Sequence, residues 1–218
     1  MIELPSMPAR IAGLRRDSRG YPVPWFVAWM DGPKVCVPGA GKPDFRVIAP
    51  GKFEQAYNSG RCWICGDPLG RHKVYVLGPM CVVSRTTNEP ASHRECAEFA
   101  ATACPFLTNP RQKRSGKNLP DNRFVADGAI DRNPGAVALY QTRLVEPFQA
   151  GRGVLFRLGP PERIDWYAEG RAATAREVED SISSGYPLLV REAERCGREA
   201  LAALPQQLAD AMMLLPAT

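Results

Sequence analysis

The chain of 218 residues has no apolar run of about 18 residues, the length that a helix needs to cross a bilayer. Its first residues, MIELPSMPARIAGLRR, lack the apolar core and the cleavage-type pattern of a secretory signal. Internal repeats and low-complexity tracts are missing as well. From these absences we expect a soluble, cytoplasmic protein with no membrane partner.

Several signatures of catalysis are also missing. The sequence has no P-loop, no GxGxxG after a strand, no GxSxG and no recognisable pair of catalytic carboxylates. It lacks the HxE and PCxxC strings that a zinc deaminase needs. Histidine is scarce, with His72 and His93 as its two examples. Whether the chain is an enzyme is left open by these patterns, and we expect a binding protein rather than an enzyme.

Cysteine, in contrast, is plentiful and unevenly placed. The seven cysteines are an odd number, and most of them lie between residues 62 and 104. At 44% hydrophobic residues the chain can bury a core without disulfides. In a reducing cytoplasm such clustering favours metal binding over a disulfide framework.

Two ligand pairs stand out within that cluster. Cys62 and Cys65 form a CxxC, and after 27 intervening residues His93 and Cys96 form an HxxC. A CxxC turn delivers two sulfurs to one ion, and residues three apart in the first turn of a helix share a face. The spacing therefore predicts a closed, structural Zn²⁺ site. Cys81 and Cys104 are expected to be buried apolar residues, although either could replace His93 in an all-cysteine site.

The order of a knuckle, a hairpin and a helix with two ligands in its first turn resembles a treble-clef zinc finger over residues 62–104. The strings CWICGDPLG, GPMC, SHRECAEFA and CPFL further resemble a group of uncharacterised phage and prophage proteins. This resemblance implies a viral or mobile-element origin, and hence a host cytoplasm as the compartment. It implies no activity.

Element signals predict an α+β fold, with short-stranded sheets around the zinc module and a helical C-terminal segment. Strands are expected near residues 24–30, 33–39, 44–50 and 135–167, and a short helix over 52–58. The Gly78-Pro79 turn predicts a hairpin between the ligand pairs. The aromatic pair Trp25 and Trp29 is interpreted as core rather than as a base-stacking platform.

Helix signals cover the ligand segment and the C-terminus. Ser92 with Glu95, and Thr174 with Glu177, predict capping boxes. Gly185 is expected to end one C-terminal helix, Pro187 to open the next, and Pro205 to start a third. These signals divide the chain into five segments. They are a β-rich segment over residues 1–60, a zinc module over 61–107, a basic loop over 108–125, a set of strands over 126–170 and a set of helices over 171–218.

Positive charge is concentrated around the cysteine cluster. The net charge is +5 for the whole chain and also +5 for residues 61–125, against +3 before them and −3 after them. A basic patch of this kind favours a polyanionic partner. We therefore expect the protein to bind nucleic acid beside the zinc site. The residues expected to make the contacts are Arg111, Lys113, Arg114, Lys117, Arg71 and Lys73, and Arg85 and Arg94 lie nearby in the sequence.

Two alternatives stay open. The first is an inhibitor or adaptor that binds a host protein. The second is an HNH-like, metal-dependent endonuclease, because nucleases of that class share the treble clef. In that case His72 would be the general base, with Asp67 and Asn88 as helpers.

Overall fold

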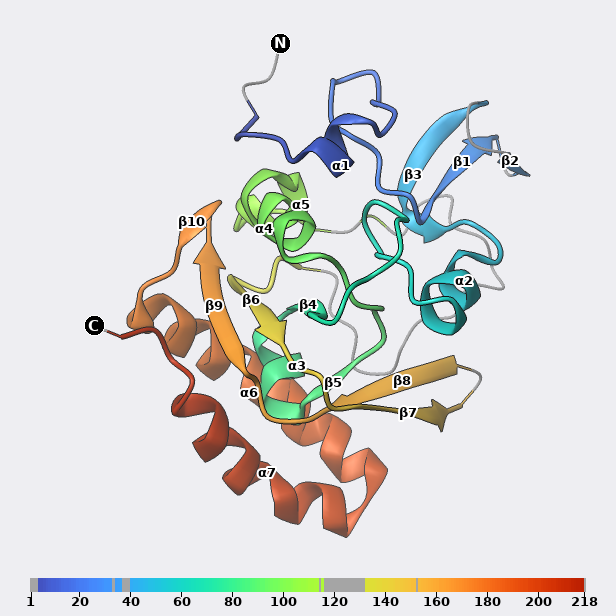
Figure 1. The fold of residues 1–218 in the computed structure, drawn as a ribbon. Coiled ribbons are helices and arrows are strands. Elements are labelled where there is room, and N and C mark those ends of the chain that lie inside the picture. The colour runs from blue at the N-terminus through green and yellow to red at the C-terminus, as the bar shows by residue number, and fades with distance from the viewer. Residues whose placement is uncertain are drawn as a thin grey trace.

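The structure is a computed structural model that describes residues 4–32, 34–36, 40–113, 115, 132–151 and 153–217. Figure 1 shows its arrangement. In chain order the elements are α1 (Ala9–Ala12), β1 (Val27–Asp31), β2 (Lys34–Cys36), β3 (Lys42–Ile48), α2 (Lys52–Asn58), β4 (Val74–Leu77), α3 (Pro79–Ser84), β5 (Thr86–Thr87), α4 (Arg94–Ala103), α5 (Pro105–Thr108), β6 (Ala136–Gln141), β7 (Val145–Ala150), β8 (Gly153–Leu158), β9 (Arg163–Ala168), β10 (Arg171–Ala172), α6 (Ala175–Cys196) and α7 (Arg198–Met212).

The largest sheet has the order β10-β9-β6-β4, and its strands pair antiparallel. Alternate residues of a strand point to opposite faces. Tyr75 and Leu77 therefore join the core cluster that includes residues of α3, α6 and α7. Val74 belongs to a second cluster, with Ala97 and Ala101 of α4. The sheet is thus covered on both faces, with α4 and α5 on one side and α6 and α7 on the other (Figure 1).

Two smaller sheets flank this layer. The N-terminal sheet has the order β2-β1-β3, and the other has the order β5-β8-β7. Helix α2 packs on the second of them, because the rings of Phe53 and Tyr57 lie 6.1 and 5.5 Å from that of Phe156. The α+β class expected from the sequence is confirmed. So are the strand regions and the helix over residues 52–58.

The hairpin predicted between the ligand pairs is wrong. β4 pairs with β6, and the chain after it folds into helix α3. Gly78 is the N-cap with an extended backbone, and Pro79 occupies the first helical turn, where its missing N–H costs no hydrogen bond. Val82 and Val83 are buried in the core cluster, and burial of this kind outweighs the β-preference of valine.

The expected break at Gly185 and Pro187 is also wrong. α6 runs unbroken through both residues and ends at Cys196, and α7 follows after the capping residue Gly197. Pro205 lies inside α7 and does not start a third helix. The capping box of Thr174 and Glu177 at the start of α6 is confirmed.

The five sequence segments stay a prediction. β4, from the segment of residues 61–107, pairs with β6, from the segment of residues 126–170. Within the described ranges, no helix combines the length and the apolar character that a membrane crossing requires.

Candidate metal centre

The first ligand pair lies in a tight turn over residues 62–67, called the knuckle below. The N–H of Cys62 donates to the carbonyl oxygen of Asp67 at 2.8 Å, and the N–H of Gly66 donates to that of Cys62 at 2.9 Å. Gly66 has φ of +82°, a conformation that glycine adopts at little cost. These bonds place both cysteine side chains on the same side of the turn, as their shared cluster requires.

The second pair lies at the start of α4. His93 is the N-cap of this helix, and Cys96 lies in its first turn. The N–H of His93 donates to Sγ of Cys62 at 3.3 Å. An N–H group at the helix start, which has no partner within the helix, is thus satisfied by a ligand sulfur. This contact joins the two pairs across the chain.

The capping box predicted for this helix is wrong. Ser92 is one position too early, is buried, and exchanges two backbone hydrogen bonds with Val74, at 2.8 and 3.1 Å. No side chain caps the helix, and Glu95 binds Arg10 instead. The helix ends at Ala103, before Cys104.

Four ligand atoms converge at the predicted residues. One atom each from Cys62, Cys65, His93 and Cys96 lies within 4.8 Å of the other three. Nδ1 of His93 is 3.4 Å from Sγ of Cys65 and 3.9 Å from Sγ of Cys96. The three cysteines are buried, and His93 is half-buried. The cluster can hold one metal ion with all of its ligands supplied by the protein.

The imidazole of His93 is oriented for metal binding. Its Nε2 lies 3.1 Å from the carbonyl oxygen of Pro68, which can only accept a hydrogen bond. The proton therefore belongs on Nε2, and Nδ1 keeps its lone pair directed at the sulfurs. Such a bond to the far nitrogen of a ligand histidine is the usual way in which proteins fix its tautomer.

Thiol ionisation in the cluster depends on neighbouring thiols. A hydrogen bond with Cys96 lowers the pKa of Cys62 to about 4. Burial raises the pKa of Cys65 to about 11, and the hydrogen bond to Cys62 raises the pKa of Cys96 well above its usual value. Thiolates packed this closely need a cation for all of them to ionise, so metal binding releases protons.

The N-terminal segment covers this cluster. Ile11 is 1% exposed and packs in one core cluster with Cys62, Cys65, Cys96 and Phe99. The guanidinium of Arg10 forms ion pairs at 3.0 Å with two carboxylates that lie next to the ligands in the chain. One is Asp67 of the knuckle and the other is Glu95, between the ligands of α4. The sequence did not reveal the role of Arg10, because its partners Asp67 and Glu95 lie 57 and 85 positions away.

The geometry of the centre is therefore complete within the described chain. No protein-family model, curated protein or solved structure matches this chain. The arrangement of the site is consequently the sole guide to its chemistry, and the expected phage origin stays a prediction.

The resemblance to a treble clef holds in part. The knuckle and the ligand helix are present, but β4, α3 and β5 stand between them where the resemblance implies a hairpin.

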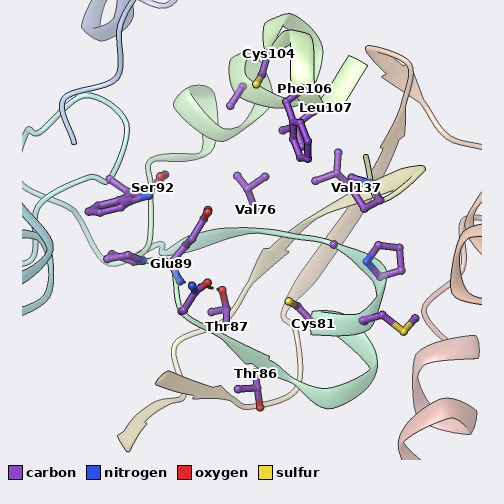
Figure 2. A pocket seen from close by; sticks show the side chains of 18 of the residues that line it. Val76, Cys81, Thr86, Thr87, Glu89, Ser92, Cys104, Phe106, Leu107 and Val137 are labelled. Atoms are coloured by element: carbon purple, nitrogen blue, oxygen red, sulfur yellow. Dashed lines mark hydrogen bonds between the residues drawn. The ribbon is translucent and has the colours of Figure 1, made fainter. Parts of the chain in front are cut away.

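Cys81 and Cys104 are not part of the ligand cluster. Both line a cavity, where they contribute to different walls, with Val76 and Val137 between them (Figure 2). Burial raises the pKa of Cys81 to about 11, which keeps it a neutral thiol. Cys81 lies in α3 and not in a strand of the predicted hairpin.

The predicted basic residues fall into separate groups. Arg71 and Lys73 are exposed between the knuckle and β4, and Lys73 accepts a backbone bond from Thr142, just after β6. Arg111 and Lys113 are exposed after α5. The backbone of Lys113 forms an antiparallel β-bridge with that of Arg132, which precedes β6. The two groups therefore lie toward opposite ends of that strand. Arg114 and Lys117 lie outside the described residues.

Two other expected cations already bind carboxylates. Arg85 pairs with Asp210 at 3.0 Å. Arg94 pairs with Glu98 at 3.0 Å and also with Asp165. Their charges are compensated within the protein, so they are less available to a partner.

His72 stands apart from the metal cluster. It is exposed, and its Nδ1 lies 3.3 Å from Nε2 of Gln141. Of the helpers expected for a nuclease, Asp67 binds Arg10.

The aromatic pair of the N-terminal segment is covered by cations. Trp29 is buried as predicted, with the guanidinium of Arg15 4.3 Å from its ring centre. The ammonium of Lys52 lies 4.0 Å from the ring centre of Trp25.

Proposed function

We propose that Cys62, Cys65, His93 and Cys96 bind one structural zinc ion, and that the protein binds nucleic acid through exposed basic residues beside it. The observation that carries the proposal is the convergence of three sulfurs and one imidazole nitrogen within 4.8 Å. Three thiolates and one imidazole form a common donor set of structural zinc sites.

A structural role follows from the number of protein ligands. A catalytic zinc keeps one position open for water or substrate, whereas four protein ligands fill a tetrahedral shell. The bond from His93 to Pro68 and the cover supplied by Ile11 also restrain the ligands and shield them from water. What the ion contributes is folding energy for the segment that carries it.

The nucleic-acid proposal is supported by uncompensated charge near this centre. Arg71 and Lys73 are exposed and make no ion pair within the described residues. The whole chain carries a net charge of +5. Phosphate contacts by such side chains supply most of non-specific binding, and they position a protein without reading bases.

The zinc proposal is tested by elemental analysis. We expect one zinc per chain in protein purified without chelator. Binding on the order of 10 kcal/mol is linked to folding in such sites, so Cys65→Ser should lose the metal and unfold residues 62–104. Cys196→Ser is the matched control, because Cys196 is exposed on α6. Less than half an equivalent of zinc in the parent, or unchanged thermal stability of Cys65→Ser, would contradict the proposal.

The nucleic-acid proposal is tested by the salt dependence of binding. Each lost phosphate contact should flatten the plot of log affinity against log salt by about 0.9 on duplex DNA. The replacement of Arg111, Lys113, Arg114 and Lys117 by Ala should flatten it by up to about 3.6 units. Because Arg71 and Lys73 lie at the other end of β6, their double variant is measured separately, with up to about 1.8 units expected.

Absence of binding sets a clear limit on this proposal. If the parent has no measurable affinity for DNA or RNA at about 50 mM salt, nucleic acid is not its partner. A complex from a host lysate that survives nuclease treatment would then favour a host protein.

A further inference from the structure

Two cations lie near each other where α2 meets the knuckle. Lys52 is the first residue of α2, and Arg61 follows this helix closely, with its N–H bonded to the carbonyl oxygen of Ala56 at 3.1 Å. Burial lowers the pKa of Lys52, and the nearby charge of Arg61 lowers it further. The geometry agrees, because the ammonium of Lys52 lies over the ring of Trp25, this ring packs on Gly66, and Arg61 donates to the carbonyl oxygen of Gly66.

In the part of the chain that the structure describes, no carboxylate pairs with either cation. Within the described residues neither Lys52 nor Arg61 makes an ion pair, and Arg61 donates instead to the carbonyl oxygen of Gly66 at 2.9 Å. Of the neighbouring acids, Asp67 is held by Arg10, and Glu54 on α2 makes no ion pair in the described part of the chain. Like charges held together without a counter-charge destabilise the free protein, and a bound anion would relieve that cost.

These two cations continue into the basic residues already assigned. Arg61 forms a backbone bridge with Pro68, and the N–H of Leu69 donates to the carbonyl oxygen of Gly60 at 2.7 Å. Arg71 lies two residues beyond that bond. We use the name knuckle face for four cations near the knuckle in the chain: Lys52 at the start of α2, Arg61 just before the knuckle, and Arg71 and Lys73 between it and β4.

We propose that the knuckle face is a contact surface for the phosphate backbone of nucleic acid, with Lys52 and Arg61 among its phosphate contacts. The inference rests on the proposed function and extends it, because neither residue has been assigned to binding. Charge complementarity selects the occupant, since these four cations make no ion pair with any described residue and the phosphates of nucleic acid carry the opposite charge.

The same geometry argues against base stacking on Trp25. The ammonium of Lys52 covers one face of the half-buried Trp25, 4.0 Å from the ring centre. Open aromatic faces are what single-strand binders use to stack bases. The surface is thus suited to contact the backbone independently of base sequence.

The test compares two variants of equal charge. Lys52→Gln/Arg61→Gln removes two cations from the knuckle face. Arg176→Gln/Arg198→Gln removes two from exposed positions on α6 and α7. Affinity for duplex DNA is measured between about 50 and 200 mM salt. We expect the slope to flatten by up to about 1.8 units in the first variant and to stay at the parent value in the second.

The outcomes separate this inference from the function on which it rests. A parent that binds DNA, with a first variant of unchanged slope and unchanged zinc content, overturns the inference and leaves the proposed function in place. A parent without DNA affinity overturns both.

A second measurement uses the unsubstituted protein, in case the variant does not fold. Amine-reactive labelling read by mass spectrometry should show Lys52 protected when duplex DNA is added. Lys42, which is exposed on β3, serves as the internal reference. Equal labelling of Lys52 with and without bound DNA would overturn the inference.

Discussion

Gly66 illustrates how one residue holds the metal centre together. Its φ is +82°, and a Cβ at this position would lie 2.5 Å from two ring carbons of Trp25. Gly60 has φ of +58° and open space where its Cβ would be. The left-handed conformation is therefore common to both glycines, whereas the contact with an indole ring is specific to Gly66.

We predict that Gly66→Ala destabilises the protein more than Gly60→Ala does. The positive φ costs about 1–2 kcal/mol at either site, and forced overpacking at Gly66 adds about 1–3 kcal/mol. Denaturant unfolding of the zinc-loaded variants measures the difference. Equal losses at the two sites would show that Trp25 does not pack on the knuckle.

At this scale the sequence is informative where chemistry and spacing are local. Cys62 and Cys65 share one turn, and His93 and Cys96 share the start of one helix, so short spacings are enough to group each pair. Arg10 and Pro68 could not be found in the same way. Their roles depend on where distant parts of the chain meet, and neither residue type is diagnostic by itself.

Among the elements, α3 and α6 differ most from their sequence patterns. The valines around Gly78 suggest strands, yet the partner of β4 is β6, far along the chain. Gly185 suggests a helix end, but a glycine is needed here because α6 packs closely on α3. A Cβ at this position would lie 3.0 Å from Cγ of Met80 on α3. Tertiary contacts decided both elements, and local propensity could not reveal them.

The start of α6 was predictable because its signal is local. Glu177 accepts from the N–H and the hydroxyl of Thr174 at 2.8 and 2.9 Å, and Arg171 donates to both of its oxygens. The side chain of Arg171 lowers the pKa of Glu177 to about 2. Because the folded pKa lies below the ordinary value near 4.5, the ionised carboxylate stabilises the fold above that value. This stabilisation is lost as the pH falls toward 2.

We predict that Glu177→Gln reduces the loss of stability between pH 6 and pH 3. Gln keeps the acceptor of the capping box but carries no charge for Arg171. Since the pair is partly exposed, the effect should be on the order of 0.5–1 kcal/mol. Unfolding free energies at both pH values measure it, with Glu179→Gln as the control. Glu179 is exposed on the same helix and makes no ion pair within the described residues. An identical pH dependence in both variants would contradict the prediction.

For the whole molecule, the metal centre joins parts that are distant in sequence. The N-terminal segment covers the ligands through Ile11, and the chain between the ligand pairs supplies β4 to the large sheet. The α+β class was predictable from alternating strand and helix signals. The grouping of strands into sheets was not, because it depends on pairings between distant segments.

This arrangement predicts that metal removal frees the N-terminal segment. Without the ion, the pocket that receives Ile11 loses its rigid floor of ligand residues, and the carboxylates bound by Arg10 are no longer held in register. Cleavage by a protease follows the population of the open form when opening is fast. We therefore expect trypsin to cut after Arg10, Arg15 or Arg16 at least about tenfold faster in chelator, which corresponds to about 1.4 kcal/mol.

Two substitutions in the zinc-loaded protein separate the contributions to this contact. Ile11→Ala removes a buried side chain worth about 2–5 kcal/mol, so it should reproduce much of the effect of the chelator. Arg10→Ala removes two ion pairs that solvent screens, so its effect should be smaller. Cleavage after Arg198, exposed at the start of α7, provides the internal reference. If chelator accelerates cleavage at Arg198 as much as in the N-terminal segment, the metal stabilises the whole fold and not this contact in particular. If it accelerates neither, the N-terminal segment is held independently of the metal.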